Sequence, residues 1–148
     1  MQLNLPVRDF KLKKEKETVF IFDELRRKYV TLTPEEWVRQ NFVAFLIKDK
    51  GFPPGLMGNE ISLEQNGIKR RCDTLIADKY GAPFVIVEYK APFISITQSV
   101  FDQIARYNMV MRAKYLIVSN GMQHFCCHID YTANTYQFLK NIPDFKEL

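Results

Sequence analysis

Two carboxylates and a lysine occupy positions in this sequence from which they could act together on one phosphate. Asp73 lies in the segment Arg71–Asp78, and Glu88 and Lys90 follow the apolar run Val85–Val87. Because successive residues of a strand point to opposite faces, Glu88 and Lys90 share a face, and Asp73 can sit beside Glu88 on a neighbouring strand. Charged groups at the end of a buried strand are costly without partners. The arrangement therefore suits a hard divalent cation and a phosphate, as in a phosphodiesterase site.

A helix start upstream supplies a further acidic group. Thr33 is suited to be the N-cap, and it is followed by a proline and two glutamates. Glu35 continues the apolar stripe of Val38 and Phe42, so we expect it to face the sheet, whereas Glu36 lies about 100° round the helix. The helix dipole favours either acid in a first turn without any further role. We favour Glu35 as a site residue, and the choice between the two acids stays open.

The remaining elements follow from turn signals and from hydrophobic spacing. Residues 1–32 are predicted to be an N-terminal extension that packs on a domain of residues 33–148, and Thr18–Tyr29 could be a strand or a helix. A second helix is predicted over Thr97–Arg112, with a core face of Val100, Ile104, Tyr107 and Met111. The predicted strands are Ile61–Gln65 and Arg71–Asp78, which form a hairpin about Asn66-Gly67, then Pro83–Tyr89, Tyr115–Ser119, Gln123–Asp130 and Thr135–Leu139. Strands flanked by two helices predict a three-layer α/β sandwich.

Three motifs together resemble a known nuclease family. The spacing D-x14-E-x-K of Asp73, Glu88 and Lys90 resembles the catalytic signature of the PD-(D/E)xK nucleases, with a cysteine in place of the usual proline. The segment Gln103–Tyr107 resembles the Q-x-x-x-Y motif that follows that lysine in helicase-nuclease branches, and TPEEWVRQ supplies the acidic helix start. From about Phe20 onward, the chain resembles the N-terminal nuclease domain of type I restriction enzyme R (endonuclease) subunits.

The resemblance implies a restriction-endonuclease-like sandwich, with a mixed central β-sheet flanked by helices, and a role for each motif residue. Asp73, Glu88 and the main-chain carbonyl of Tyr89 would hold Mg²⁺, or Mn²⁺ as a substitute. The bound ion lowers the pKa of a water and neutralises phosphate charge, while Lys90 orients the water and stabilises the phosphorane. The nearest alternative is a structural salt-bridge cluster at the end of a strand.

The resemblance also implies DNA as a partner. In the families that it resembles, the residues equivalent to Gln103 and Tyr107 support the active site and touch the DNA backbone. These two residues also share one helix face, as a core tyrosine and a polar neighbour would. Arg71, in the basic cluster that directly precedes Asp73, could flank the DNA backbone. The net charge of +4, from 21 basic and 17 acidic residues, is compatible with nucleic acid without requiring it.

Composition narrows the class of protein. With 148 residues, of which 47% are hydrophobic and 26% charged, the chain predicts one globular domain. It has no apolar stretch near 18 residues and no apolar signal segment, so we expect no membrane association. Three cysteines make no disulfide framework, which indicates the cytoplasm. His124, Cys126 and His128 alternate as zinc ligands could, but no fourth ligand lies nearby.

The sequence thus predicts a Mg²⁺-dependent DNA endonuclease domain. Because G-x-x-x-x-G-K-[ST] is absent, the chain itself cannot be the ATP-driven translocase of a type I enzyme. The resemblance implies a translocase or modification and specificity subunits as partners. Two alternatives remain from other classes. One is a catalytically silent DNA-binding or docking module that keeps the nuclease fold, and the other is an interaction domain without a nucleic-acid role.

Overall fold

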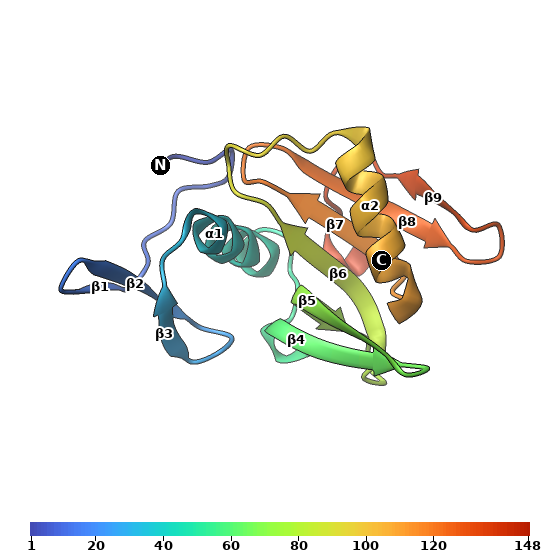
Figure 1. Ribbon diagram of the computed structural model, residues 1–148, viewed down its shortest axis with the longest axis horizontal. Coiled ribbons are helices and arrows are strands. Elements are labelled where there is room, and N and C mark those ends of the chain that lie inside the picture. The colour runs from blue at the N-terminus through green and yellow to red at the C-terminus, as the bar shows by residue number, and fades with distance from the viewer.

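A six-stranded sheet forms the centre of the computed structural model, which describes residues 1–148 (Figure 1). Its strands lie in chain order and are β4 (Met57–Gln65), β5 (Ile68–Ala77), β6 (Pro83–Tyr89), β7 (Tyr115–Ser119), β8 (His124–Asp130) and β9 (Thr135–Phe138). All neighbours are antiparallel except β6 and β7, which are parallel. Parallel neighbours require a crossover connection, and this one contains the helix α2 (Gln98–Asn108).

The two α-helices cover opposite faces of this sheet. Alternate residues of each central strand belong to two separate apolar clusters, so Val85 and Val87 of β6 face one side and Ile86 faces the other. The helix α1 (Pro34–Lys48) contributes Val38, Phe42 and Leu46 to the first cluster, and α2 contributes Phe101 and Ala105 to the second. The predicted three-layer α/β architecture with a mixed sheet is confirmed. Neither helix is long and apolar enough to cross a membrane.

The local signals that the sequence carries correspond to observed elements. Thr33 caps α1, because its side chain accepts a hydrogen bond from the Glu36 N–H at 3.0 Å. The β4–β5 hairpin turns at Asn66-Gly67, where both residues have positive φ, as a tight two-residue turn requires. The strand predicted over Pro83–Tyr89 is observed with the same bounds.

The predicted core face of α2 is wrong. Val100 and Ile104 are only half-buried and Tyr107 is 45% exposed, whereas Phe101, Ala105 and Asn108 are buried. The α-helix also ends at Asn108 and is followed by a 3₁₀ turn over Met109–Met111. Ala105 is small and Asn108 is polar, so two of the three buried positions give little apolar signal. The spacing of the larger apolar residues therefore pointed to the neighbouring face of the helix, with Val100 and Ile104. Met111, which lies in the 3₁₀ turn, is buried as expected.

The N-terminal residues form a second, three-stranded antiparallel sheet beside α1 (Figure 1). Its strands are β1 (Leu12–Glu15), β2 (Thr18–Asp23) and β3 (Lys28–Thr31), so the segment Thr18–Tyr29, which could have been a strand or a helix, is a strand, a turn and the start of another strand. β1 is exposed throughout, as its charge predicts. Ile21 of β2 is fully buried, whereas Leu3, which precedes the sheet, joins the α1 core cluster. The domain boundary near residue 33 stays a prediction.

Candidate active site

The carboxylates of Asp73 and Glu88 meet where β5 and β6 lie side by side. Thr74 is opposite Val87 in this antiparallel pair, so Asp73 and Glu88 are the next two residues across it. The Tyr89 N–H donates a hydrogen bond to Asp73 Oδ2 at 2.9 Å, which directs this carboxylate toward the end of β6. The register of the sheet therefore brings together two acids that are 15 residues apart in the sequence.

The surroundings of Glu88 disfavour the charged form of its carboxyl group. Its Oε1 is buried and has no hydrogen-bond partner. Burial raises the pKa of Glu88 to about 10, the neighbouring charge of Asp73 acts in the same direction, and Asn108 and Lys90 only partly oppose them. At neutral pH the carboxyl group holds a proton unless a cation takes its place.

Lys90 and Glu35 lie within the electrostatic reach of this pair. The Lys90 N–H donates to the Ser119 carbonyl at 2.9 Å, which continues the β6–β7 pairing, and its side chain makes no ion pair. Burial and then the charge of Asp73 raise the pKa of Glu35, while Lys90 lowers it. Four of the predicted site residues thus gather at one end of the sheet: Asp73, Glu88, Lys90 and Glu35.

The reason for favouring Glu35 over Glu36 is wrong. Glu36 faces the interior and is 6% exposed, whereas Glu35 is exposed. Glu36 is buried because two arginines neutralise it: Arg26 Nη2 lies 2.8 Å from Oε1 and Arg39 Nε lies 3.0 Å from Oε2. Glu36 is thereby committed to structural ion pairs, and Glu35 is the acid left beside Asp73 without an ion-pair partner.

The predicted DNA-contacting residues lie on the surface, apart from the half-buried pair of Asp73 and Glu88. Gln103 and Tyr107 occupy the exposed face of α2. The Arg70 guanidinium covers the Tyr107 ring at 4.3 Å from its centroid, and its Nε–H donates to the Tyr107 carbonyl at 2.8 Å. Arg71, whose side chain is 66% exposed, pairs with Glu60. The α2 residue that reaches Glu88 is Asn108, which sequence reasoning missed.

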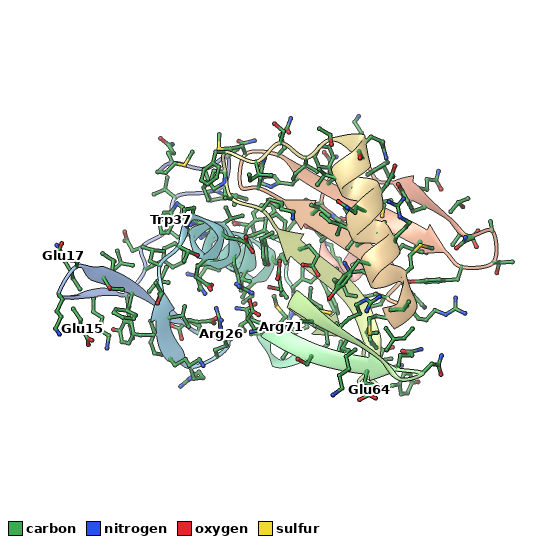
Figure 2. All side chains as sticks on the ribbon, in the orientation of Figure 1. Glu15, Glu17, Arg26, Trp37, Glu64 and Arg71 are labelled. Atoms are coloured by element: carbon green, nitrogen blue, oxygen red, sulfur yellow. The ribbon has the colours of Figure 1, made fainter.

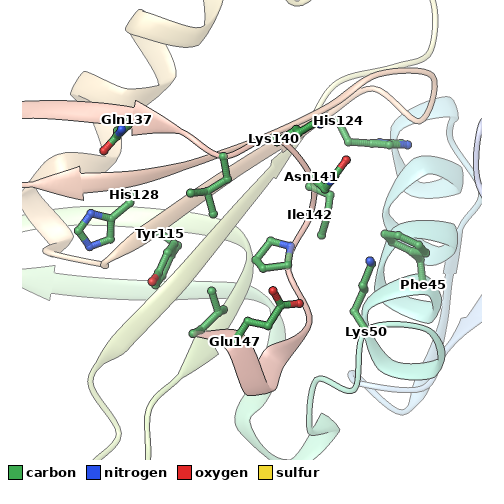
Figure 3. Close-up of a pocket in the computed structure, with 13 residues that line it drawn as sticks. Phe45, Lys50, Tyr115, His124, His128, Gln137, Lys140, Asn141, Ile142 and Glu147 are labelled. Carbon is green, nitrogen blue, oxygen red and sulfur yellow. The ribbon is translucent and has the colours of Figure 1, made fainter.

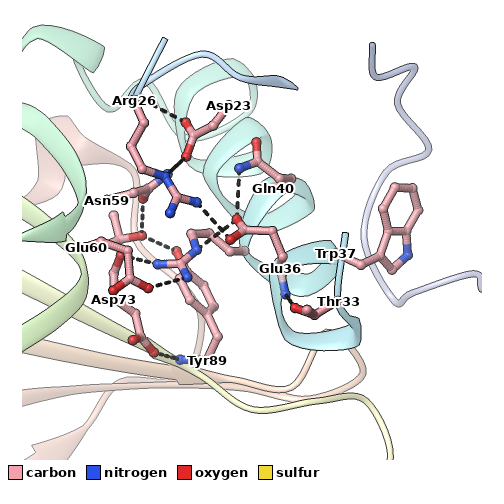
Figure 4. A network of polar contacts seen from close by, with 12 residues as sticks. Asp23, Arg26, Thr33, Glu36, Trp37, Gln40, Asn59, Glu60, Asp73 and Tyr89 are labelled. Atoms are coloured by element: carbon pink, nitrogen blue, oxygen red, sulfur yellow. Dashed lines mark hydrogen bonds and ion pairs between the residues drawn. The ribbon is translucent and has the colours of Figure 1, made fainter. Parts of the chain in front are cut away.

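A buried arginine, also missed from the sequence, connects α1 with the site, and Figure 4 shows the residues that it bonds, Glu36, Glu60 and Asp73. Arg39 is 5% exposed and uses three nitrogens on three partners. Besides binding Glu36, it donates from Nη1 to the Asp73 main-chain carbonyl at 2.6 Å and from Nη2 to Glu60 Oε1 at 2.6 Å. The only sequence signal is an arginine three residues after an acid on the same helix.

The polar network extends from the site to the N-terminal sheet. The Tyr89 hydroxyl donates to Thr74 Oγ1 at 2.8 Å, Thr74 donates to Asn59 Oδ1 at 2.6 Å, and Asn59 Nδ2 donates to Asp23 Oδ2 at 2.9 Å. Asp23 in turn pairs with Arg26. In Figure 2, Arg26 lies on the turn after β2 and Arg71 lies on β5. β2, α1, β4, β5 and β6 are therefore joined through buried hydrogen bonds.

A separate hollow, of about 990 Å³, lies away from these residues (Figure 3). Tyr115, His124 and His128 line it, together with the C-terminal segment. His124 lies 2.7 Å from Ser119 Oγ and 3.0 Å from the Asn4 carbonyl, and Cys126 is buried in the core. No group of three or more His, Cys, Asp or Glu side chains in the chain is arranged to hold a metal ion by itself.

Comparison with known proteins identifies the family to which this chain belongs. Residues 34–143 match the model of the family described as type I restriction enzyme R protein N terminus. The chain belongs to this family. The match begins at the first residue of α1, so β1–β3 lie outside it.

A solved structure shares the fold. It is described as a fragment of an HsdR subunit of a type I restriction enzyme from Vibrio vulnificus YJ016, and it superposes with a TM-score of 0.56 at 22% sequence identity. The likeness covers 79% of this chain and 24% of the other, so the chain spans about a quarter of that protein's length. No curated protein matches this chain.

The first prediction concerns Glu88 in metal-free protein. A carboxyl whose pKa rises from 4.5 to about 10 on folding stabilises the protein fully below pH 4.5, and this contribution is lost as the pH rises toward 10. Glu88→Gln cannot ionise, so its free energy of unfolding should fall less steeply with pH, by up to about 1.4 kcal/mol per pH unit. Denaturant unfolding in EDTA between pH 5 and pH 9 measures this difference. Glu64→Gln, at an exposed position of β4, should follow the wild type; parallel pH profiles for all three proteins would contradict the assignment.

Proposed function

We propose that this chain is a Mg²⁺-dependent nuclease domain of the PD-(D/E)xK type, which hydrolyses phosphodiester bonds in DNA as part of a type I restriction system. One observation carries the proposal: a buried carboxylate oxygen of Glu88 lacks any partner and lies beside a second carboxylate, Asp73. Such a pair is unfavourable by itself. A divalent cation would compensate both charges at once.

The donor set fits a hard cation. Mg²⁺ prefers oxygen ligands, keeps several waters and is commonly held by one or two carboxylates. We assign the protein ligands to Asp73, Glu88 and the main-chain carbonyl of Tyr89. The hydrogen bond from the Tyr89 N–H keeps Asp73 Oδ2 directed toward this point, at 2.9 Å. Bound Mg²⁺ supplies an activated water and neutralises charge on the phosphate.

Lys90 and Glu35 provide the remaining charges. Because the Lys90 ammonium has no ion-pair partner within the protein, it is available to stabilise the charge that develops on the phosphate in the transition state. Glu35 is exposed at the start of α1, and its raised pKa suits a group that exchanges protons with water at the site.

DNA would approach over the exposed residues of β5 and α2. Arg71, Gln103 and Tyr107 are all exposed there, and the stacked pair of Arg70 and Tyr107 presents a cation and an aromatic ring together. Arginines bind phosphate oxygens without reading sequence. We assign little sequence preference to the domain itself. Translocation and target choice would come from a translocase and from modification and specificity subunits.

The second prediction tests the metal. Mg²⁺ or Mn²⁺ should raise the melting temperature of the wild type, because an ion at 100 times its Kd adds about 2.7 kcal/mol to a protein that binds it only when folded. Asp73→Asn should lose this shift. In EDTA it should gain stability relative to the wild type as the pH approaches 10, where Glu88 ionises and its repulsion from Asp73 would otherwise act. Differential scanning fluorimetry measures both effects, with Glu64→Gln as the control. An equal metal response from the wild type and from Asp73→Asn would rule out this site.

The third prediction concerns DNA affinity. Replacing Lys69, Arg70 and Arg71 by alanine should weaken duplex binding and flatten its dependence on salt, because each lost phosphate contact lowers the slope of log K against log salt by about 0.9. Fluorescence anisotropy in Ca²⁺ at several salt concentrations measures the slope. Binding by the wild type that does not depend on salt would favour an interaction domain without a nucleic-acid role.

The fourth prediction concerns catalysis. Lys90→Ala should lower single-turnover cleavage of a supercoiled plasmid by about 10²–10³, since it removes one electrostatic group that acts mainly in the transition state. DNA affinity and the metal-induced shift should change little. Lys90→Arg should rescue poorly, because a planar fork does not replace a compact ammonium. Lys114→Ala, at an exposed position, is the matched control.

The cleavage assay distinguishes the proposed nuclease from a catalytically silent docking module. If Lys90→Ala cuts as fast as the wild type, the activity lies elsewhere on the chain and the proposal is wrong. If no protein cuts but all bind DNA, the chain is a silent docking module that keeps the nuclease fold.

A further inference from the structure

The pairing of β4 with β5 is interrupted at one position, which joins Glu60 and Asp73. The antiparallel register of β4 and β5 holds on both sides of the Glu60–Asp73 position, but these two residues do not pair in the ladder. Glu60 has a φ of +57°, a left-handed conformation that residues with a Cβ rarely adopt within a strand. The chain thus accepts local strain directly opposite a predicted metal ligand.

The Arg39 guanidinium occupies the gap. From α1, it donates to the Asp73 carbonyl and to the Glu60 carboxylate, each at 2.6 Å, so it bonds both residues that the ladder leaves unpaired. Glu36 holds the third edge of the same guanidinium, at 3.0 Å from Nε. A planar fork can serve three acceptors in fixed directions, and a charged donor makes a stronger bond than a neutral amide.

The two ends of Asp73 are then held from different sides. Arg39 fixes its main-chain carbonyl, and the Tyr89 N–H fixes its carboxylate at 2.9 Å. If the carbonyl turned back into a regular ladder, the side chain of Asp73 would rotate with it and lose its place beside Glu88. The strained φ of Glu60 is the local consequence of keeping this arrangement.

We propose that Arg39, supported by Glu60, is a positioning residue that holds Asp73 out of the regular β4–β5 ladder, so that its carboxylate stays aimed at the metal site. The proposal rests on the proposed function only in assigning a metal-binding role to Asp73. The hydrogen bonds from Arg39 to Asp73 and Glu60 are present in the metal-free protein, so they can be tested without an activity assay.

A loss of stability would not by itself support this role. Removing Arg39 takes one of two arginine partners from the buried Glu36 and one of two from the half-buried Glu60, which destabilises a protein whatever the arginine positions. Arg26 is the matched control, because it pairs with Glu36 at 2.8 Å and with Asp23 but contacts neither Asp73 nor Glu60. Arg39→Lys and Arg26→Lys both keep the positive charge and lose the fork. Glu60→Gln is a milder second variant, should Arg39→Lys fold poorly.

The experiment compares amide hydrogen exchange by NMR in EDTA. The Tyr89 amide, whose acceptor is Asp73 Oδ2, should exchange about tenfold faster in Arg39→Lys relative to the Val87 amide within the same strand, as expected for one weakened hydrogen bond. Glu60→Gln should change this ratio in the same direction, and Arg26→Lys should leave it unchanged. An unchanged ratio in Arg39→Lys, or an equal change in Arg26→Lys, would overturn the proposal.

A titration with Mn²⁺ separates this proposal from the proposed function. Arg39→Lys should need about tenfold more Mn²⁺ for its half-maximal thermal shift, whereas Arg26→Lys should melt at a lower temperature with an unchanged midpoint. A wild type that shows no shift contradicts the metal site, and the exchange ratio then still decides whether Arg39 positions Asp73. If Mn²⁺ shifts the melting temperature of the wild type, and both lysine variants have the same Mn²⁺ midpoint as the wild type, then Arg39 does not position Asp73. The metal site is supported in that case.

Discussion

The free-energy cost of ionising Glu88 beside Asp73 in a partly buried position is the constraint around which the site is organised. The register of β5 and β6 sets the two carboxyl groups side by side, and the core that covers Glu88 leaves its Oε1 without a partner. A protein core seldom leaves such a group unsatisfied, because an unpaired buried acceptor destabilises the fold by about 1–3 kcal/mol. Lys90 and Asn108 only moderate the effect. The proposed cation would supply the partner that the Glu88 oxygen lacks.

Most of the polar core supports this small region. Arg39 links α1 to the backbone of Asp73, and the chain from Tyr89 through Thr74 and Asn59 to Asp23 links β6 to the N-terminal sheet. The family match covers only residues 34–143, yet Asp23 and Arg26, which precede it, belong to this network. The first strands of the chain therefore contribute to the framework of the site as well as to its periphery.

The features of the fold that depend on a few adjacent residues were predictable from the sequence. The cap at Thr33, the Asn66-Gly67 turn and the end of β6 each depend on a few adjacent residues, and all three were located correctly. The proximity of Asp73 and Glu88 also followed, because a hairpin-like pair of strands fixes which residues lie opposite.

Long-range polar contacts were not predictable in this way. Arg39 and Glu36 carry no hydrophobic period, and their burial depends on partners far away in the chain, including Arg26 and Glu60. The face of α2 was misjudged because Ala105 and Asn108 contribute little apolar signal although both are buried. Nothing in a glutamate indicates a left-handed backbone, so the strain at Glu60 became visible only in three dimensions.

The central claim is that Asp73 and Glu88 together form a cation site. The most direct test is a crystal structure of the protein grown with Mn²⁺, with anomalous data collected to locate the ion. We expect one strong anomalous peak within coordination distance of Asp73 and of the Glu88 oxygen that lacks a partner in the metal-free protein. A map without a peak there, with the two carboxyl groups still side by side, would contradict it.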